Sequence, residues 1–99
     1  MMELPALRLL LRGYFTIDWP EDYGDPWLAV EDFAKSEPQL APKLREEVDH
    51  LLATTTTEGE LRNTVLNEFG SGYVAEADGW EYRPWLKEVV RRVDEELSR

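Results

Sequence analysis

The sequence predicts an all-α fold, a compact single-domain bundle of about five short helices with an aromatic and acidic loop between the first two helices. At 99 residues the chain has the size of one domain, which would span residues 1–99. Apolar residues make up 42% and charged residues 32% of the chain, a balance typical of globular proteins rather than disordered or fibrous ones. Most apolar residues recur at the three- and four-residue spacing of one helix face.

The first helix is expected from about Pro5 to Arg12, because proline suits a first helical position and Gly13 is a suitable stop. Its apolar face would be formed by Leu7, Leu10, Leu11 and Tyr14. From Tyr14 to Tyr23 the chain has four aromatic residues and a proline without any regular periodicity, which predicts an ordered loop.

The second and third helices are separated by a proline. Asp25 can cap a helix that starts at Pro26, and its apolar face would be Trp27, Val30, Phe33 and Ala34. Ser36 and Pro38 interrupt this pattern, because proline disfavours helical geometry in the preceding residue. A third helix is expected to restart at about Pro38, with a buried stripe of Leu40, Leu44, Val48, Leu51 and Leu52.

The β-branched run Thr54–Thr57 should end the third helix, and Thr57 with Glu60 has the spacing of a capping box that starts a fourth. Gly70 stands where a left-handed C-terminal cap is expected. The apolar face of this fourth helix would be Leu61, Val65, Leu66 and Phe69.

A second irregular loop is expected between Gly72 and Gly79. The last helix is predicted from about Tyr82 to Leu97, with an apolar stripe of Leu86, Val89, Val90, Val93 and Leu97. As an alternative, either Phe15–Trp19 or Tyr73–Ala77 could form a short strand, which would leave the helical class unchanged.

Composition excludes several classes of function. The chain has no cysteine and one histidine, His50, so it lacks the ligands for cysteine-bound zinc, iron–sulfur clusters and histidine-cluster metal sites. The formal net charge of −10 opposes direct binding to nucleic acid or to an anionic membrane and favours a basic partner. No apolar run is long enough for a membrane span and no signal-peptide pattern is present, so a cytoplasmic location is expected.

The densest chemical feature is an acidic and aromatic segment between Gly13 and Ala34, which has six carboxylates and no lysine or arginine. Carboxylates can steer an oppositely charged partner, while aromatic side chains can anchor it. The competing interpretation is that the aromatic residues belong to the core and the carboxylates only solubilise the surface. The predicted partner-binding residues are Asp18, Trp19, Glu21, Asp22, Tyr23, Asp25, Trp27, Glu31 and Asp32.

The sequence also contains other candidate sites. A second acidic patch is expected around Glu76, Asp78 and Glu81, beside Trp80 and Tyr82. Four carboxylates of the first segment could bind calcium or magnesium or serve a small metal-dependent hydrolase, but the segment lacks the ligand spacing and central glycine of an EF-hand. No nucleophile elbow, phosphate loop or dinucleotide motif is present, and His50 is most simply an exposed helix residue. We therefore predict no catalytic residue, no metal and no cofactor.

The run from Gly13 to Phe33, GYFTIDWPEDYGDPWLAVEDF, resembles the immunity proteins of bacterial contact-dependent growth inhibition (CDI) systems. The pattern is a GYF-x-x-DW segment, then Y-G-D/E-x-x-x-A-V-x-x-F, a G-x-G/C-Y turn and an x-W-L helix, in order over nearly the whole chain. Thr16 and Ile17 fill the variable pair of the first motif. The matching residues are Gly13, Tyr14, Phe15, Asp18, Trp19, Tyr23, Gly24, Asp25, Ala29, Val30, Phe33, Gly70, Gly72, Tyr73, Trp85 and Leu86.

This resemblance implies a non-enzymatic antitoxin that binds and blocks the C-terminal toxin domain of a polymorphic toxin. Such toxins are often nucleases, which need a basic cleft that an acidic inhibitor complements. A monomer forming a 1:1 heterodimer with the toxin is the expected assembly, because no heptad seam is present. The alternative is an acidic nucleic-acid mimic that regulates a host DNA- or RNA-binding protein.

Overall fold

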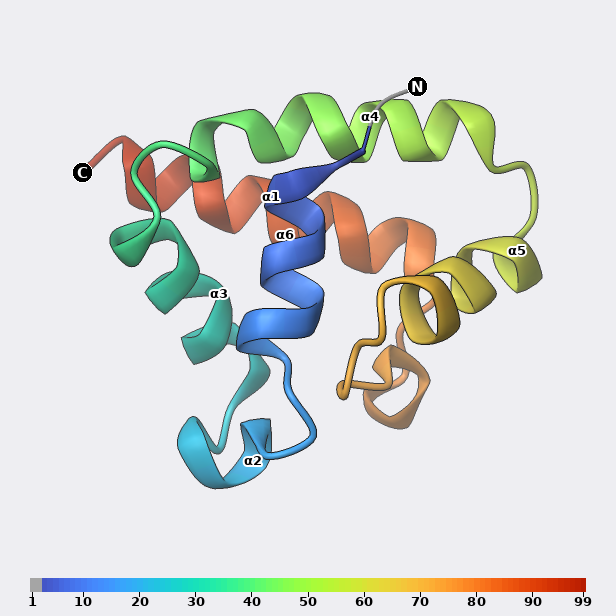
Figure 1. The fold of residues 1–99 in the computed structure, drawn as a ribbon, viewed down its shortest axis with the longest axis horizontal. Coiled ribbons are helices and arrows are strands. Elements are labelled where there is room, and N and C mark those ends of the chain that lie inside the picture. Colours follow the sequence, from blue (N-terminus) through green and yellow to red (C-terminus); the bar gives the residue numbers. More distant parts are fainter. Residues whose placement is uncertain (1–2) are drawn as a thin grey trace.

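The protein is all-α throughout residues 3–99, the part of the chain that this computed structural model describes (Figure 1). It measures 33 × 28 × 21 Å. The predicted bundle of about five short helices is confirmed, with additional single turns between them. The elements are α1 Pro5–Arg8, η1 Leu9–Tyr14, α2 Trp19–Asp22, α3 Pro26–Ser36, η2 Ala41–Lys43, α4 Leu44–Thr54, α5 Glu58–Asn63, η3 Thr64–Glu68, η4 Ala75–Asp78 and α6 Tyr82–Leu97.

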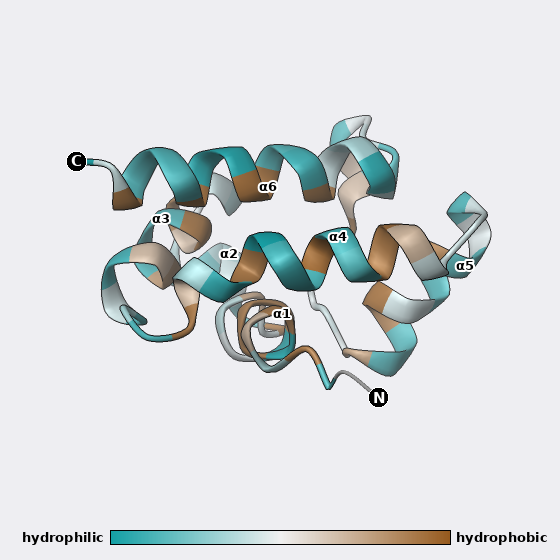
Figure 2. Ribbon diagram, turned by 90° about the horizontal axis from the view of Figure 1, so that it is seen from above, coloured by the Kyte–Doolittle hydropathy of each residue, from teal (hydrophilic) through white to brown (hydrophobic). Residues whose placement is uncertain are grey.

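The long helix α6 is the centre of the packing. It contacts α3, α4 and α5, while α1 packs against α4 and its continuation η1 packs against α3. Seen from above, α4 and α6 lie alongside each other and the apolar residues of α6 are on the side that faces the interior (Figure 2). The short helix α2 lies at the bottom of Figure 1, at the far end of η1 and α3 from α4. The fully buried α6 residues are Trp85, Leu86, Val89 and Val93.

Three predicted helix caps are confirmed. The side chain of Asp25 accepts a hydrogen bond of 2.8 Å from the Trp27 N–H at the start of α3. Thr57 accepts one of 3.1 Å from the Glu60 N–H at the start of α5. Gly70 follows η3 with a φ of 71°, a left-handed conformation that glycine adopts without strain.

Two segments are more helical than predicted. Gly13 does not stop the first helix. The chain continues through η1 to Tyr14 in a wider coil, and the Phe15 N–H donates a hydrogen bond of 3.0 Å to the Leu10 carbonyl at its end. The predicted loop Tyr14–Tyr23 contains the helical turn α2. Proline in the first turn and the carboxylates of Glu21 and Asp22 near the helix N-terminus both favour that turn.

Two further predictions need correction. The third helix does not restart at Pro38, because the Leu40 and Ala41 N–H groups both turn back to the Glu37 carbonyl and the α-helix begins only at Leu44, after the η2 turn. A second proline in η2, which lacks an N–H, accounts for this delay. No strand forms anywhere in the described chain, so the alternative for Phe15–Trp19 and Tyr73–Ala77 is wrong. The backbone of the latter segment enters η4 instead.

The start of α6 and the end of α4 are tied together by side chains from outside each helix. The carboxylate of Glu58 accepts hydrogen bonds from the N–H groups of Tyr82 at 2.7 Å and Arg83 at 3.0 Å. The Arg83 guanidinium in turn donates to the carbonyls of Leu52 and Thr55. A charged side chain therefore pairs with two of the backbone groups at each of these helix ends.

Candidate functional site

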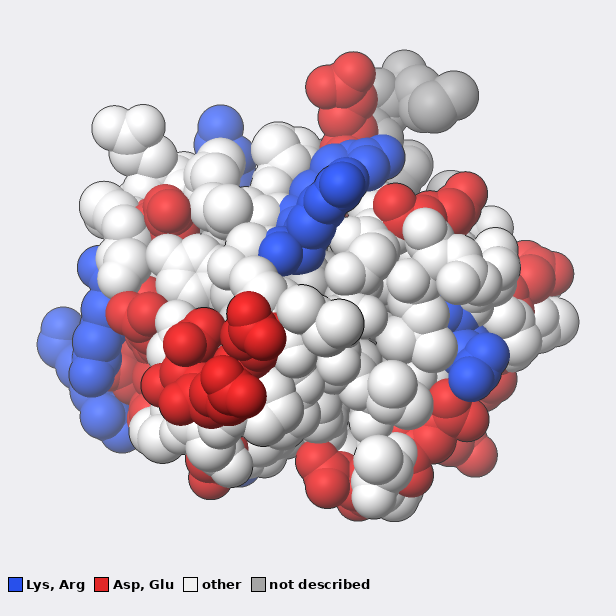
Figure 3. All heavy atoms as spheres, turned by 60° about the horizontal axis from the view of Figure 1, so that its bottom comes forward, with Lys and Arg blue, Asp and Glu red and all other residues white. Residues whose placement is uncertain are grey.

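Four of the predicted carboxylates are exposed on and around α2. Asp18 precedes this turn, Glu21 and Asp22 lie on it, and Asp25 follows it. Figure 3 brings this underside of the molecule forward and shows a cluster of acidic side chains left of its centre, with a basic side chain across the upper middle and other basic groups to the left and right. The sequence prediction of an acidic surface here is therefore matched by side chains that reach solvent.

The other two carboxylates of the segment belong to α3 and are only half-exposed. Asp32 accepts hydrogen bonds from the Tyr23 hydroxyl at 2.6 Å and the Ser36 hydroxyl at 2.9 Å. Glu31 lines a groove with the basic residues Arg91, Arg92 and Arg99 of the C-terminal region. Glu31 and Asp32 thus lie among groups of this same chain, apart from the four exposed carboxylates.

The aromatic residues of the segment are held by the fold. Phe15 is fully buried and stacks on Tyr73, with ring centroids 5.2 Å apart. Trp19 is half-buried, meets Tyr73 edge-on at 5.2 Å and donates its indole N–H to the Gly72 carbonyl at 3.2 Å. These contacts fix the position of α2 against the loop after η3.

Tyr23 and Trp27 also have partners within the chain. Burial and the hydrogen bond to Asp32 raise the pKa of the Tyr23 phenol. Trp27 meets Trp80 edge-on at 6.0 Å, and the guanidinium of Arg92 lies 4.1 Å from the centre of the Trp27 ring. Cation–π contacts of this kind contribute about 0.5–2 kcal/mol. Each of these side chains is half-exposed, so each retains surface that a partner can touch.

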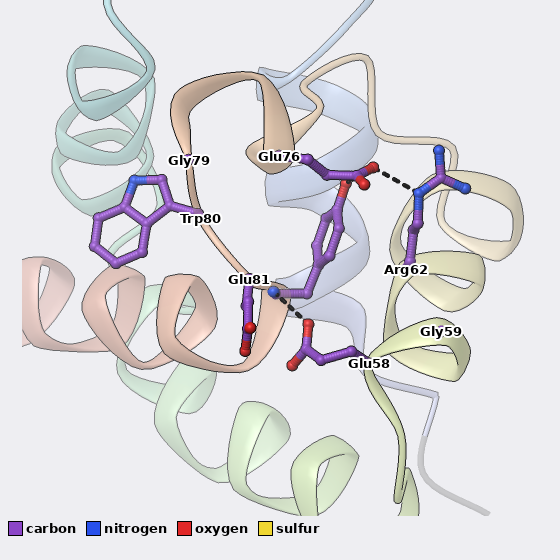
Figure 4. Close-up of a pocket in the computed structure, with 8 residues that line it drawn as sticks. Glu58, Gly59, Arg62, Glu76, Gly79, Trp80 and Glu81 are labelled. Atoms are coloured by element: carbon purple, nitrogen blue, oxygen red, sulfur yellow. Dashed lines mark hydrogen bonds and ion pairs between the residues drawn. The ribbon is translucent and has the colours of Figure 1, made fainter.

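The second predicted patch borders a pocket of about 420 Å³ between α5, η4 and the start of α6 (Figure 4). Arg62 and Glu76 point toward one another in it and form an ion pair of 2.5 Å, while Glu58 reaches the backbone of α6. Glu81 is exposed. The pocket is lined by Glu58, Gly59, Arg62, Glu76, Gly79, Trp80, Glu81 and Tyr82.

The two acidic regions adjoin one another. The contact between Trp27 and Trp80 joins them on one side, and the stack of Phe15 and Tyr73 joins them in the core. Asp78 accepts a hydrogen bond of 2.7 Å from the Tyr73 hydroxyl. That bond, together with burial as the larger cause, raises the pKa of Tyr73.

The described residues do not assemble a cluster of metal ligands. Within residues 3–99, no three histidine or acidic side chains are placed to hold one metal ion. His50 is exposed on α4, beside a shallow groove that also contains Thr54 and Glu68. None of the helices in this range has the length and apolar character needed to cross a membrane.

The sequence matches the family described as "CdiI immunity protein" over residues 3–93. The chain belongs to the CdiI immunity protein family. Immunity proteins of this family are toxin inhibitors and not enzymes, in agreement with the prediction of a non-enzymatic antitoxin.

The fold of this CdiI family member is also similar to a solved structure. A chain in the crystal structure of a CdiA-CT/CdiI complex from Y. kristensenii 33638 matches with a TM-score of 0.86 and 25% sequence identity. The match covers 93% of this chain and 99% of that chain. No curated protein sequence matches this one. The resemblance to CDI immunity proteins that the GYFTIDW motif indicated is thus confirmed.

Sequence reasoning overlooked two features of the site. Ile17 stood out only as part of a variable pair, yet its side chain is 88% exposed beside the acidic patch. The pocket role of Glu58 and Arg62 was also missed, because their partners lie 14 to 25 residues away in the sequence. For Ile17 the available indication was a large apolar residue in a segment that fits no helical face.

Proposed function

We propose that this chain is an immunity protein that binds the C-terminal toxin domain of its cognate CDI toxin and neutralises it by covering a basic functional surface. The observation that carries this proposal is the group of exposed carboxylates around α2 in a chain of net charge −10. Membership of the CdiI family and the fold shared with a chain of a CdiA-CT/CdiI complex support it.

The proposed toxin is a nuclease. An enzyme that grips a polyanion needs a cleft of positive potential, and an acidic protein surface can occupy such a cleft in place of the substrate. Asp18, Glu21, Asp22 and Asp25 are the proposed steering charges. Glu31 and Asp32 are proposed as weaker contributors, because both are only half-exposed and lie beside groups of this same chain.

The half-exposed rings of Trp19, Tyr23 and Trp27 are the proposed aromatic contacts with the toxin domain. Their internal hydrogen bonds and ring contacts hold them in place before binding, which lowers the entropy lost on association. The proposed complex is a 1:1 heterodimer formed in the cytoplasm, where the toxin would act on its substrate.

The test is a titration of this protein against the C-terminal domain of the toxin encoded beside it, at several salt concentrations, with toxin activity measured in the same samples. Nanomolar binding that weakens as salt increases, with nuclease activity lost at one equivalent, is the expected result. Tight binding with inhibition of a different reaction would retain the immunity function and overturn the nuclease assignment. Absence of binding would overturn the proposal.

A further inference from the structure

Ile17 is the most exposed large apolar side chain in residues 3–99. Its 88% exposure compares with 48% for Leu28 and 39% for each of Val74 and Leu97. An isoleucine in this position contributes almost no buried area to the folded protein, so folding stability gives no reason for an apolar residue there.

The backbone on both sides of Ile17 is held firmly. The Gly72 N–H donates to the Phe15 carbonyl at 2.6 Å, and the Trp19 N–H donates to the Thr16 carbonyl at 3.0 Å. The Trp19 indole N–H also donates a hydrogen bond to the Gly72 carbonyl. Ile17 therefore projects from an ordered turn whose neighbours on each side are tied to the loop after η3.

The surroundings of this side chain are acidic. Asp18 follows it directly, and Glu21 and Asp22 lie on the adjoining turn α2. Gly72, in the loop after η3, lies against the backbone of Thr16. Two residues further along that loop is Val74, whose side chain is also partly exposed. The apolar side chain of Ile17 thus projects from the surface beside the carboxylates of α2. An exposed apolar residue with charged neighbours is the arrangement expected of an interface anchor.

We propose that Ile17 is the apolar anchor of the interface with the toxin domain and inserts into an apolar recess bordered by basic side chains on that domain. This inference rests on the proposed function above and adds the residue that determines affinity within it. The carboxylates of α2 speed the encounter, and the buried isoleucine slows dissociation. Because its backbone is already ordered, Ile17 can be buried in the complex with little further loss of entropy.

The test compares binding of the cognate toxin domain by the full-length protein and three variants. Ile17→Ser should weaken binding about tenfold or more, mainly through faster dissociation, whereas Ile17→Val should lose at most about fourfold. The control is Leu97→Ser, an exposed apolar residue at the C-terminal end of α6 and away from α2 in Figure 1, and it should bind like the parent protein. The two Ile17 variants should keep the parent melting temperature, because the Ile17 side chain is 88% exposed.

Three results would overturn the inference, and they are distinguishable. If the parent protein binds the toxin domain and Ile17→Ser binds equally well, Ile17 is not an anchor, while the immunity function stands. If the parent protein itself does not bind, the proposed function fails and this inference fails with it. Equal weakening by Ile17→Ser and Leu97→Ser would also count against a specific role for Ile17.

Discussion

The carboxylate of Glu47 accepts a hydrogen bond of 2.9 Å from the backbone N–H of Leu7, forty residues earlier in the chain. Its second oxygen accepts another from the Ala6 N–H at 3.1 Å. Glu47 lies on α4 and is only 2% exposed, so it is a buried charge whose partners are the free N–H groups at the start of α1. The negative charge also faces the positive end of the helix dipole there, although α1 itself is only one turn long before it widens into η1.

This contact predicts a large loss of stability for Glu47→Ala. The variant would leave two buried N–H groups without acceptors and should lower the free energy of unfolding by about 2–4 kcal/mol. Urea denaturation followed by circular dichroism measures this change. Glu46→Ala, at the neighbouring exposed position of the same helix, is the control and should stay within about 0.5 kcal/mol of the parent. Similar stabilities for the two variants would show that the Glu47 contact is unimportant.

Gly72 allows two loops to touch. A Cβ atom at this position would lie 2.4 Å from the Thr16 carbonyl oxygen and 2.9 Å from the Ile17 nitrogen, both of them backbone atoms. Gly72→Ala must therefore displace the turn that presents Ile17, with an expected loss of about 1–3 kcal/mol in stability and weaker toxin binding. Thermal unfolding and a binding titration check these two effects.

Gly59 provides the matched control for that substitution. A Cβ atom added there would have no neighbour within 4 Å, and the residue lies inside α5. Gly59→Ala should leave toxin binding unchanged and stabilise the protein by up to about 1 kcal/mol, because alanine favours the helix. A Gly72→Ala variant as stable as Gly59→Ala would contradict the close approach of the two loops.

Glu88 predicts a specific dependence of stability on acid. Hydrogen bonds from Arg91 at 2.8 Å and then Arg92 at 2.9 Å lower the pKa of Glu88 to about 2 from an ordinary value of 4.5. A carboxyl group with a lower pKa in the folded state stabilises that state above pH 4.5, and this stabilisation disappears as the pH falls toward 2. Glu88→Gln should therefore lower the melting temperature at pH 7 and differ less from the parent at low pH.

A series of melting temperatures between pH 7 and pH 2 tests this prediction. The control is Glu60→Gln, because the Glu60 side chain is exposed and forms no ion pair within residues 3–99. A constant difference between the parent and Glu88→Gln across this pH range would exclude a pH-dependent contribution from the Glu88 pair.

The two acidic regions can be compared by removing charge without removing bulk. Asp18→Asn, Glu21→Gln and Asp22→Asn combined should slow association with the cognate toxin domain on the order of tenfold at low salt, because electrostatic steering acts on the encounter rate. The pair Asp78→Asn and Glu81→Gln, at the pocket beside η4, should change the rate much less. Stopped-flow or surface-based kinetics at two salt concentrations measures the association rate of both variants. A larger effect of the second pair would show that the toxin domain binds at the pocket and not at α2.

Local rules were sufficient for most of the helical architecture. Asp25 and Thr57 cap helices by contacts within three residues, and the stripe from Leu86 to Val93 follows a single helix face, so each could be found from spacing alone. The contacts that place the candidate site could not be found in this way. Trp19 is held by a carbonyl group fifty-three residues away, and no local pattern distinguishes that indole from an exposed one.

For the same reason, the sequence did not show which carboxylates of the acidic segment are exposed. Its six carboxylates look alike in a charge count, but Asp32 is occupied by two hydroxyl groups while Glu21 and Asp22 lie free on a turn. Exposure depends on which side of α3 faces α6, and that follows from tertiary packing.

The central position of α6 also affects when a newly made copy of the protein becomes functional. Synthesis runs from the N-terminus, so α1 to α5 leave the ribosome before the helix whose Trp85, Leu86 and Val89 fill the middle of the core. Until α6 emerges, the Leu52 and Thr55 carbonyls lack the guanidinium of Arg83, and Trp27 lacks that of Arg92. A nascent chain in which α6 has not yet emerged therefore has an incomplete core and lacks the contacts that hold Trp27 and the end of α4.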